Sequence, residues 1–128
     1  MKVFSTIILG AGSGDRMNGI DKILSEISGL PAILHSVNAF LEVGIFQNTI
    51  VVANTDNIAE LKRLLSASKY QSVDVVLGGK RRQDSVKIGL DKIRSSDYVM
   101  IHDGARPCVS PALIKRGVVA AETSDAAI

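Results

Sequence analysis

The chain of 128 residues has one cysteine, no tryptophan and only 4% aromatic residues. The single cysteine, Cys108, excludes an internal disulfide framework and a zinc site built from cysteines alone, and it suits a reducing compartment. No apolar run approaches the ~18 residues that a membrane-spanning helix needs. The N-terminus also lacks the long apolar stretch of a signal peptide. We therefore expect a cytoplasmic protein that does not enter a membrane.

The chain also has little net charge. Fifteen Lys and Arg residues against thirteen Asp and Glu residues leave a net charge of +2, which gives no basic face for a nucleic-acid duplex. Hydrophobic residues make up 46% and charged residues 22%, an ordinary globular balance that excludes disorder and collagen-like repeats. The length is enough for one domain and not comfortably for two.

Short apolar runs alternate with helical patterns along the chain. The apolar runs predict strands at residues 3–9, 49–53, 73–77 and 98–102. The helical patterns predict helices at residues 31–43, 58–65 and 84–93, and one that opens at Ser110-Pro111 with Ser110 as its N-cap. Gly44 lies just past the predicted end of the first helix. Asn57 and Glu60 fit a capping box for the second helix, and Val86, Leu90 and Ile93 should face inward on the third. This alternation predicts an α/β protein with a Rossmann-like, three-layer α/β/α fold and a mainly parallel sheet.

The chain ends at a point where a further strand should begin. Thr123-Ser124-Asp125 is typical of a turn, and Ala126-Ala127-Ile128 would open a fifth strand. The predicted sheet would then keep an uncovered edge, which complete domains usually avoid. We therefore expect residues 1–128 to be a truncated part of a single domain.

Ligands of parallel α/β folds sit beyond the carboxyl ends of the strands, so we expect the segments at residues 10–22, 78–85 and 103–106 to converge on one cleft at this edge. The first strand runs into GAGSGDRM at residues 10–17, whose small residues allow successive backbone N–H groups to cradle phosphate oxygens. The segment fits neither the dinucleotide fingerprint nor the Walker A pattern. Arg16 and Lys22 are two cations on the same loop, suited to the phosphates of one nucleotide. The alternative is a glycine turn with two solvated cations.

Two further segments follow later strands. GGKRRQDSV at residues 78–86 combines glycines, three successive cations and a helix start, which suits an anion or a base edge, or else is a solvated surface. HDGARP at residues 102–107 places Asp103 at a strand end, where it can bind a ribose hydroxyl or a magnesium ion carried by a triphosphate. Arg106 can pair with a second phosphate, and the alternative is a structural Asp103–Arg106 pair. His102 and His35 are expected to be structural, and Cys108 is expected to be inert.

In order and spacing, these three segments resemble the 2-C-methyl-D-erythritol 4-phosphate cytidylyltransferase family of non-mevalonate (MEP pathway) isoprenoid biosynthesis. The matching motifs are a Gly-rich loop with Arg-Met and a following Lys, GG-x-x-R-x-x-SV, and HD-x-ARP. The resemblance covers essentially the whole chain but only about the first half of a typical member. The family usually has Pro before the Lys, where this chain has Asp21. The run RMNGIDK is also similar to the loop of the molybdenum-cofactor nucleotidyltransferases.

The resemblance implies transfer of CMP from CTP to 2-C-methyl-D-erythritol 4-phosphate, with release of pyrophosphate and with magnesium as the cofactor. Arg16 and Lys22 would be the catalytic residues, Arg106 would bind the acceptor phosphate, and Asp103 would lie near the metal. The implied nucleotide-binding residues are Gly10, Ala11, Gly12, Gly14, Gly79, Arg82, Ser85 and Asp103. Residues 1–128 would form the nucleotide-binding part of one nucleotidyltransferase domain. The absent C-terminal half would carry a dimerisation arm, so the full-length protein would be a homodimer.

Two alternatives remain open at this point. The chain could belong to another nucleotidyltransferase, with ribitol phosphate or a molybdopterin as the acceptor. It could also be a non-catalytic nucleotide-binding module, because α/β sheets host many functions. Pyrophosphate release from CTP with candidate acceptors distinguishes these alternatives.

Overall fold

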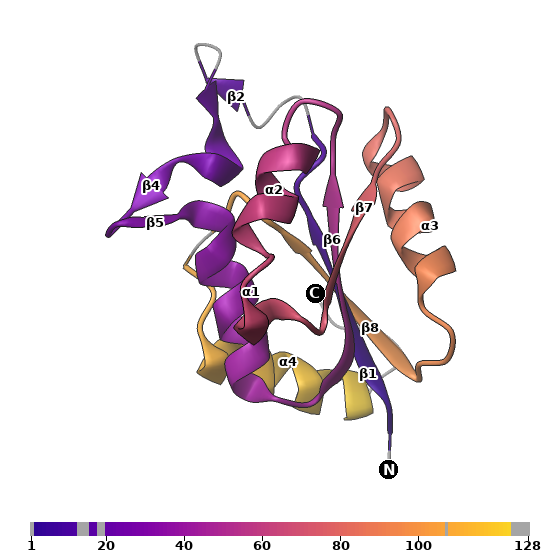
Figure 1. Ribbon diagram of the computed structural model, residues 1–128. Helices are drawn as coiled ribbons and strands as arrows, with labels where there is room; N and C mark the ends of the chain where they lie inside the picture. Colours follow the sequence, from indigo (N-terminus) through magenta and orange to yellow (C-terminus); the bar gives the residue numbers. More distant parts are fainter. Residues whose placement is uncertain (1, 13–15, 18–19, 107, 124–128) are drawn as a thin grey trace.

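A computed structural model describes residues 2–12, 16–17, 20–106 and 108–123, without the side chains of residues 16, 17 and 20. Its centre is a four-stranded parallel sheet in the order β7-β6-β1-β8 (Figure 1). The strands are β1 (Phe4–Leu9), β6 (Phe46–Ala53), β7 (Val73–Leu77) and β8 (Tyr98–Asp103). The predicted parallel sheet is confirmed, and β6 begins three residues before the predicted strand because Phe46 already pairs with Phe4.

Helices cover both faces of this sheet. The helices are α1 (Ala32–Val43), α2 (Ile58–Leu64), α3 (Arg82–Lys92) and α4 (Pro111–Thr123). Ile8 and Val51 face a core shared with α1, α2 and α4, whereas Ile7, Ile50 and Val52 face α3. Figure 1 shows α3 alone on its side of the sheet. The three-layer prediction is therefore confirmed.

Smaller elements stand between β1 and α1. Two short antiparallel pairs, β2 (Arg16–Met17) with β3 (Ile20–Asp21) and β4 (Glu26–Ile27) with β5 (Leu30–Pro31), flank the 3-10 helix η2 (Lys22–Leu24). A second 3-10 helix, η3 (Ser68–Tyr70), precedes β7. The pairs β2–β3 and β4–β5 lie near the carboxyl end of the sheet (Figure 1). Among the described residues, no helix is long and apolar enough to span a membrane.

Several predicted helix details are confirmed. Gly44 ends α1 in the left-handed conformation, with φ of 76°. The hydroxyl of Ser110 accepts the Leu113 N–H at 3.1 Å, so Ser110 is the cap of α4. Helix α1 begins one residue later than predicted, because Pro31 belongs to β5. The predicted strand at residues 126–128 lies outside the described residues.

Helix α3 differs from its prediction in two respects. It begins at Arg82 rather than Asp84, because Asp84 is the third helical residue and its carboxylate accepts the backbone N–H of Arg81 at the N-cap. Val86 and Ile93 pack against the sheet as predicted, but Leu90 is 42% exposed. The reason is that α3 is the single helix that the described residues place on this face, so no neighbouring helix covers its flanks.

The predicted Asn57–Glu60 capping box is wrong. Asn57 occupies the N-cap position of α2, but its side chain makes no hydrogen bond to the first turn of this helix. Glu60 instead pairs with Arg63 one turn further along. The turn that leads into α2 is capped instead by Asn54, whose Oδ1 accepts the Asp56 and Asn57 N–H groups at 2.9 Å. The Asn57 amide is buried and bonds to residues far away in the sequence, which are described with the site.

The close contact between α3 and β1 gives a first prediction. A Cβ at Gly89 would lie 2.9 Å from Cδ1 and 3.0 Å from Cγ2 of Ile7, which is fully buried. We expect Gly89→Ala to lower the free energy of unfolding by about 1–3 kcal/mol, because overpacking outweighs the ~1 kcal/mol of helix propensity that alanine gains. Equilibrium unfolding in urea measures the difference.

Gly117→Ala in α4 is the matched control. Its Cβ would meet only Met100 Cε, the end of a flexible side chain that can move aside. This variant should be as stable as the parent or more stable. Equal effects of the two substitutions would show that α3 does not approach β1 as closely as described.

Candidate functional site

Three glycines stand where the chain leaves the carboxyl edge of the sheet. Each of their amides donates a 2.7 Å hydrogen bond to a carbonyl at the end of the neighbouring strand: Gly10 to Val52, Gly78 to Ala53, and Gly104 to Leu9. These bonds extend the sheet by one residue beyond its strands. The three loops that carry the sequence motifs therefore start from fixed points on one edge.

These glycines are required by packing. An added Cβ would lie within 3 Å of a neighbouring atom at each of them: 2.8 Å from Ile23 Cδ1 at Gly10, 2.5 Å from Ser85 Oγ at Gly78, and 2.9 Å from the Leu9 carbonyl at Gly104. The neighbours include backbone and buried side chains that cannot move aside cheaply. A residue larger than glycine would displace the loops from the sheet edge.

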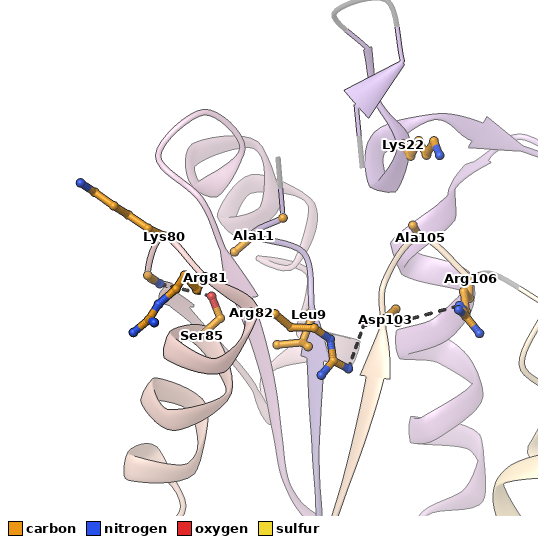
Figure 2. A pocket seen from close by; sticks show the side chains of 12 residues that line it. Leu9, Ala11, Lys22, Lys80, Arg81, Arg82, Ser85, Asp103, Ala105 and Arg106 are labelled. Atoms are coloured by element: carbon orange, nitrogen blue, oxygen red, sulfur yellow. Dashed lines mark hydrogen bonds and ion pairs between the residues drawn. The ribbon is translucent and has the colours of Figure 1, made fainter. Parts of the chain in front are cut away.

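The three loops surround a pocket of about 450 Å³ (Figure 2). The residues that line it are Leu9, Ala11, Gly12, Lys22, Gly79, Lys80, Arg81, Arg82, Ser85, Asp103, Ala105 and Arg106. The pocket spans the ends of β1 and β8. The connection from β1 to β6 passes over the face of the sheet that α1 covers. The connection from β7 to β8 passes over the opposite face, which α3 covers. Ligands of open α/β sheets bind at such a switch point.

The pocket contains most of the predicted site residues. Eight of them line it: Ala11, Gly12, Lys22, Gly79, Arg82, Ser85, Asp103 and Arg106. Gly10 lies at the sheet edge as a buried backbone position. Gly14 and the side chain of Arg16 lie outside the described part of the chain. The expectation that the three segments meet at one edge is confirmed, while the individual roles stay predictions.

Four lining residues have no role in the sequence analysis: Leu9, Lys80, Arg81 and Ala105. Lys80 and Arg81 belong to the run of three cations that the sequence analysis assigned as a group to an anion or a base edge, without a separate role for each. Leu9 and Ala105 carry no chemical signal in the sequence. They line the pocket because β1 and β8 end beside each other.

Positive charge dominates the pocket. Among its described lining residues Asp103 is the one carboxylate, against five cations from all three loops. Asp103 lies 3.4 Å from Arg82 Nη2 and 3.8 Å from Arg106 Nε, and the two arginine side chains are 63% and 80% exposed. Ion pairs this exposed contribute only about 0–1 kcal/mol, so they do not act as a structural clamp. Both arginines stay available to an anionic ligand.

Arg81 is bound differently from its neighbours. Its Nε donates to Asp84 Oδ2 at 3.1 Å, and the Asp84 carboxylate in turn accepts the Arg81 backbone N–H. This hydrogen bond lowers the pKa of Asp84 and raises the pKa of Arg81. The Arg81 side chain is 69% exposed, so this pair is as weak as those of Arg82 and Arg106, and all three cations of this loop stay available to a ligand (Figure 2).

Ser85 supports the second loop from the first turn of α3. Its hydroxyl accepts the Gly79 N–H at 3.2 Å, and the residue is 3% exposed. The pocket therefore has backbone and a small hydroxyl on this wall, next to the positive end of the α3 dipole. Figure 2 shows Lys80, Arg81 and Ser85 on one side of the pocket and Lys22, Ala105 and Arg106 on the other.

His102, on β8, forms a hydrogen bond to the backbone of the third loop. Its Nε2 lies 2.9 Å from the Arg106 carbonyl oxygen, which also accepts the Ser36 hydroxyl at 3.1 Å. A carbonyl can only accept, so Nε2 carries the proton in the neutral ring. Burial lowers the pKa of His102, and the hydrogen bond to the Arg106 carbonyl offsets part of this effect. The predicted structural role of His102 agrees with these contacts.

The lowered pKa of His102 predicts how stability depends on pH. In the unfolded chain this ring takes up a proton near its ordinary pKa of 6.5, and in the folded chain only at lower pH. The unfolded state then binds more protons between these two pKa values. The free energy of unfolding should therefore fall as the pH is lowered from above 6.5 through the folded pKa.

His102→Gln tests this dependence, because glutamine keeps an N–H for the Arg106 carbonyl and does not titrate. Urea unfolding of the parent and the variant between about pH 8 and about pH 5 should give a shallower slope for the variant. Identical slopes would mean that His102 has the same pKa in the folded and unfolded states.

The strand order, the switch point and the cationic pocket define a Rossmann-like α/β domain of the nucleotidyltransferase type. The family model of 2-C-methyl-D-erythritol 4-phosphate cytidylyltransferase matches residues 4–128. The chain belongs to this family.

Individual relatives agree with this assignment. The chain is 34% identical to the 2-C-methyl-D-erythritol 4-phosphate cytidylyltransferase of Dehalococcoides mccartyi, over 95% of this chain and 54% of that protein. It is 42% identical to the bifunctional enzyme IspD/IspF of Desulfotalea psychrophila, over 91% of this chain and 31% of that protein. The crystal structure of 4-diphosphocytidyl-2C-methyl-D-erythritol synthase from Anaerococcus prevotii superposes with a TM-score of 0.81 at 29% identity, covering 96% of this chain and 52% of that one. The chain spans about half the length of its single-function curated relatives.

Proposed function

We propose that this chain forms the CTP-binding part of an enzyme that transfers CMP from CTP to 2-C-methyl-D-erythritol 4-phosphate. The observation that carries the proposal is the pocket, in which three glycine-anchored loops bring five cations together in a member of this family. A triphosphate and an acceptor phosphate together need several positive groups in one place. The pocket volume of about 450 Å³ lies within the range of small-ligand sites.

The base and ribose belong on the part of the pocket that consists of backbone and small side chains. Ala11, Gly12 and Gly79 leave peptide groups accessible there, and Ser85 holds the Gly79 amide. A small pocket that is lined by backbone in this way suits a pyrimidine better than a purine. Asp103 lies at the end of β8, where its carboxylate can accept a ribose hydroxyl.

The described residues fit a magnesium ion that arrives on the triphosphate. Such an ion needs one or two protein carboxylates besides the phosphate oxygens, and Asp103 is the carboxylate that lines the pocket. When bound, the ion would neutralise phosphate charge. Among the described residues no group of three or more His, Cys, Asp or Glu side chains forms an all-protein metal cage.

The reaction is an in-line displacement at phosphorus. A phosphate oxygen of the acceptor attacks the α-phosphorus of CTP, the bond from this phosphorus to the β-phosphate oxygen breaks, and pyrophosphate leaves with the electron pair. No covalent enzyme intermediate is required. The task of the protein is to position the two phosphates and to neutralise the charge that builds up on the α-phosphorus. We assign this neutralisation to Arg16 and Lys22, and the acceptor phosphate to Arg106.

Substitution of Lys22 tests this assignment. Lys22→Met keeps most of the aliphatic stem and removes the charge, and it should lower kcat about 100-fold with a much smaller effect on the Kd of CTP. Arg16→Ala should act in the same direction. Lys62→Met is the control, because Lys62 is exposed on α2 and does not line the pocket. Unchanged turnover in both site variants would make these residues solvated surface cations.

Pyrophosphate release by the intact gene product tests the function itself. Release should require both CTP and 2-C-methyl-D-erythritol 4-phosphate. Release with ribitol phosphate or a molybdopterin in place of this acceptor would point to another nucleotidyltransferase. CTP binding without pyrophosphate release under any of these conditions would identify a non-catalytic nucleotide-binding module.

A further inference from the structure

We propose that the buried amide of Asn57 and the carboxylate of Asp21 form a lock that positions Lys22 at the pocket. Asn57 is then a positioning residue for the reaction, and Lys22 is the group on which it acts. The consequence for turnover rests on the proposed function. The lock itself is a property of the fold and can be measured without any substrate.

The hydrogen bonds of Asn57 join both ends of the Gly-rich loop. Its Nδ2 donates to the Gly10 carbonyl and to Asp21 Oδ2, each at 2.8 Å. Its Oδ1 accepts the Asn54 N–H at 2.9 Å. The side chain is 1% exposed, so it has no solvent to replace a lost partner. Gly10 begins the loop and Asp21 ends it, and one buried amide therefore fixes the distance between them.

Asp21 passes this constraint to Lys22. Its second oxygen, Oδ1, accepts the Ile23 N–H at 3.2 Å, which makes Asp21 the cap of η2. Ile23 is fully buried, and its Cδ1 fills the space beside Gly10. Lys22 therefore lies between Asp21, whose carboxylate is hydrogen-bonded, and Ile23, whose side chain is buried.

The backbone of Lys22 is therefore held on both sides, while its side chain is exposed and lines the pocket. Figure 2 shows Lys22 at the mouth of the pocket, above Ala105. A long lysine side chain samples many rotamers, so the position of its backbone decides where the ammonium group can reach. Misplacement by about 1 Å can cost about 100-fold in rate.

The position of Asn57 in its own helix supports this assignment. Asn57 stands at the N-cap of α2, where its side chain could accept an amide of the first turn, and it makes no such bond. Its amide is turned instead toward residues 47 and 36 positions away in the chain. Each of these partners belongs to the loop that carries Lys22. Asn54 Oδ1 caps the turn that leads into α2 by accepting the Asn57 N–H at 2.9 Å, so the side-chain N–H groups of Asn57 are available to this loop.

Asn57→Asp is the direct test, because it keeps the size of the side chain and replaces the donor by a carboxylate. The new charge would face the Gly10 carbonyl and Asp21. In the intact protein we expect kcat to fall about 100-fold while the Kd of CTP changes less than about threefold. Exchange of the Ile23 amide, followed by NMR without substrate, should become about tenfold faster because its acceptor Asp21 is released.

Asn48→Asp is the matched control. Asn48 lies on β6 before its fully buried segment, and its amide donates to the Ser5 hydroxyl at 3.0 Å. The substitution makes the same chemical change at a part-buried asparagine that does not line the pocket. It should leave kcat and Ile23 exchange close to the parent values.

The double variant Asn57→Asp, Asp21→Asn reverses the direction of the hydrogen bond between the two side chains. Its kcat should be at least about tenfold higher than that of Asn57→Asp, because the effects of substitutions at two residues in contact are not additive. A role of Asn57 in stability alone would give no such recovery at temperatures where all variants are folded. If Asn57→Asp fails to fold, Asp21→Ala at its half-buried position gives the same two readouts.

The outcomes separate the two proposals. Parent-like kcat and parent-like Ile23 exchange in Asn57→Asp would overturn the lock, and so would a loss of kcat with unchanged exchange. A parent protein that binds CTP and releases no pyrophosphate with any acceptor would overturn the proposed function. In that case Ile23 exchange in the variants still decides whether Asn57 holds the loop.

Discussion

The site depends on the pairing of β1 with a parallel strand on each side. All six residues of β1 are buried, because β6 and β8 flank it and helices cover both faces. The hydrogen bonds continue past the strand ends into Gly10, Gly78 and Gly104. Since these glycine amides are fixed on one edge, the loops that follow them must share one space. The pairing of the strands therefore brings the walls of the pocket together.

This arrangement gathers positively charged side chains in the pocket, although the net charge of the whole chain is small. A net charge of +2 over the whole sequence is small, yet five cations and one carboxylate line a single pocket. Like charges at this spacing repel one another, and the repulsion is tolerated because their side chains extend into solvent. Exposed arginines lose little when a ligand replaces their present contacts with Asp103. An anion that enters the pocket relieves the repulsion and gains several charge-assisted hydrogen bonds.

Local sequence rules were reliable wherever one face of an element met the core. The alternation of apolar runs and helices predicted four strands, four helices and a parallel sheet, because burial on two faces demands continuous apolar strands. Gly44 and Ser110 end and begin their helices through bonds within a few residues. Leu90 is the contrary case. Its place in the helical period is right, but its burial depends on a neighbouring element that periodicity does not report.

The sequence by itself determined the strand ends, the three motif loops and therefore the residues that meet in the pocket. Only the tertiary structure decided the role of Asn57, whose pattern with Glu60 matches a local cap and whose amide bonds to Gly10 and Asp21 instead. It also explained Asp21, which stands where the family usually has proline. The φ of Asp21 is −76°, within the range that a proline ring enforces, and hydrogen bonds to Asn57 and Ile23 hold it there. A cap is a bond between near neighbours and can be predicted from spacing. A buried amide can hydrogen-bond to groups from any part of the chain that the fold brings beside it. Which groups it contacts depends on which buried donors and acceptors would otherwise lack a hydrogen-bond partner.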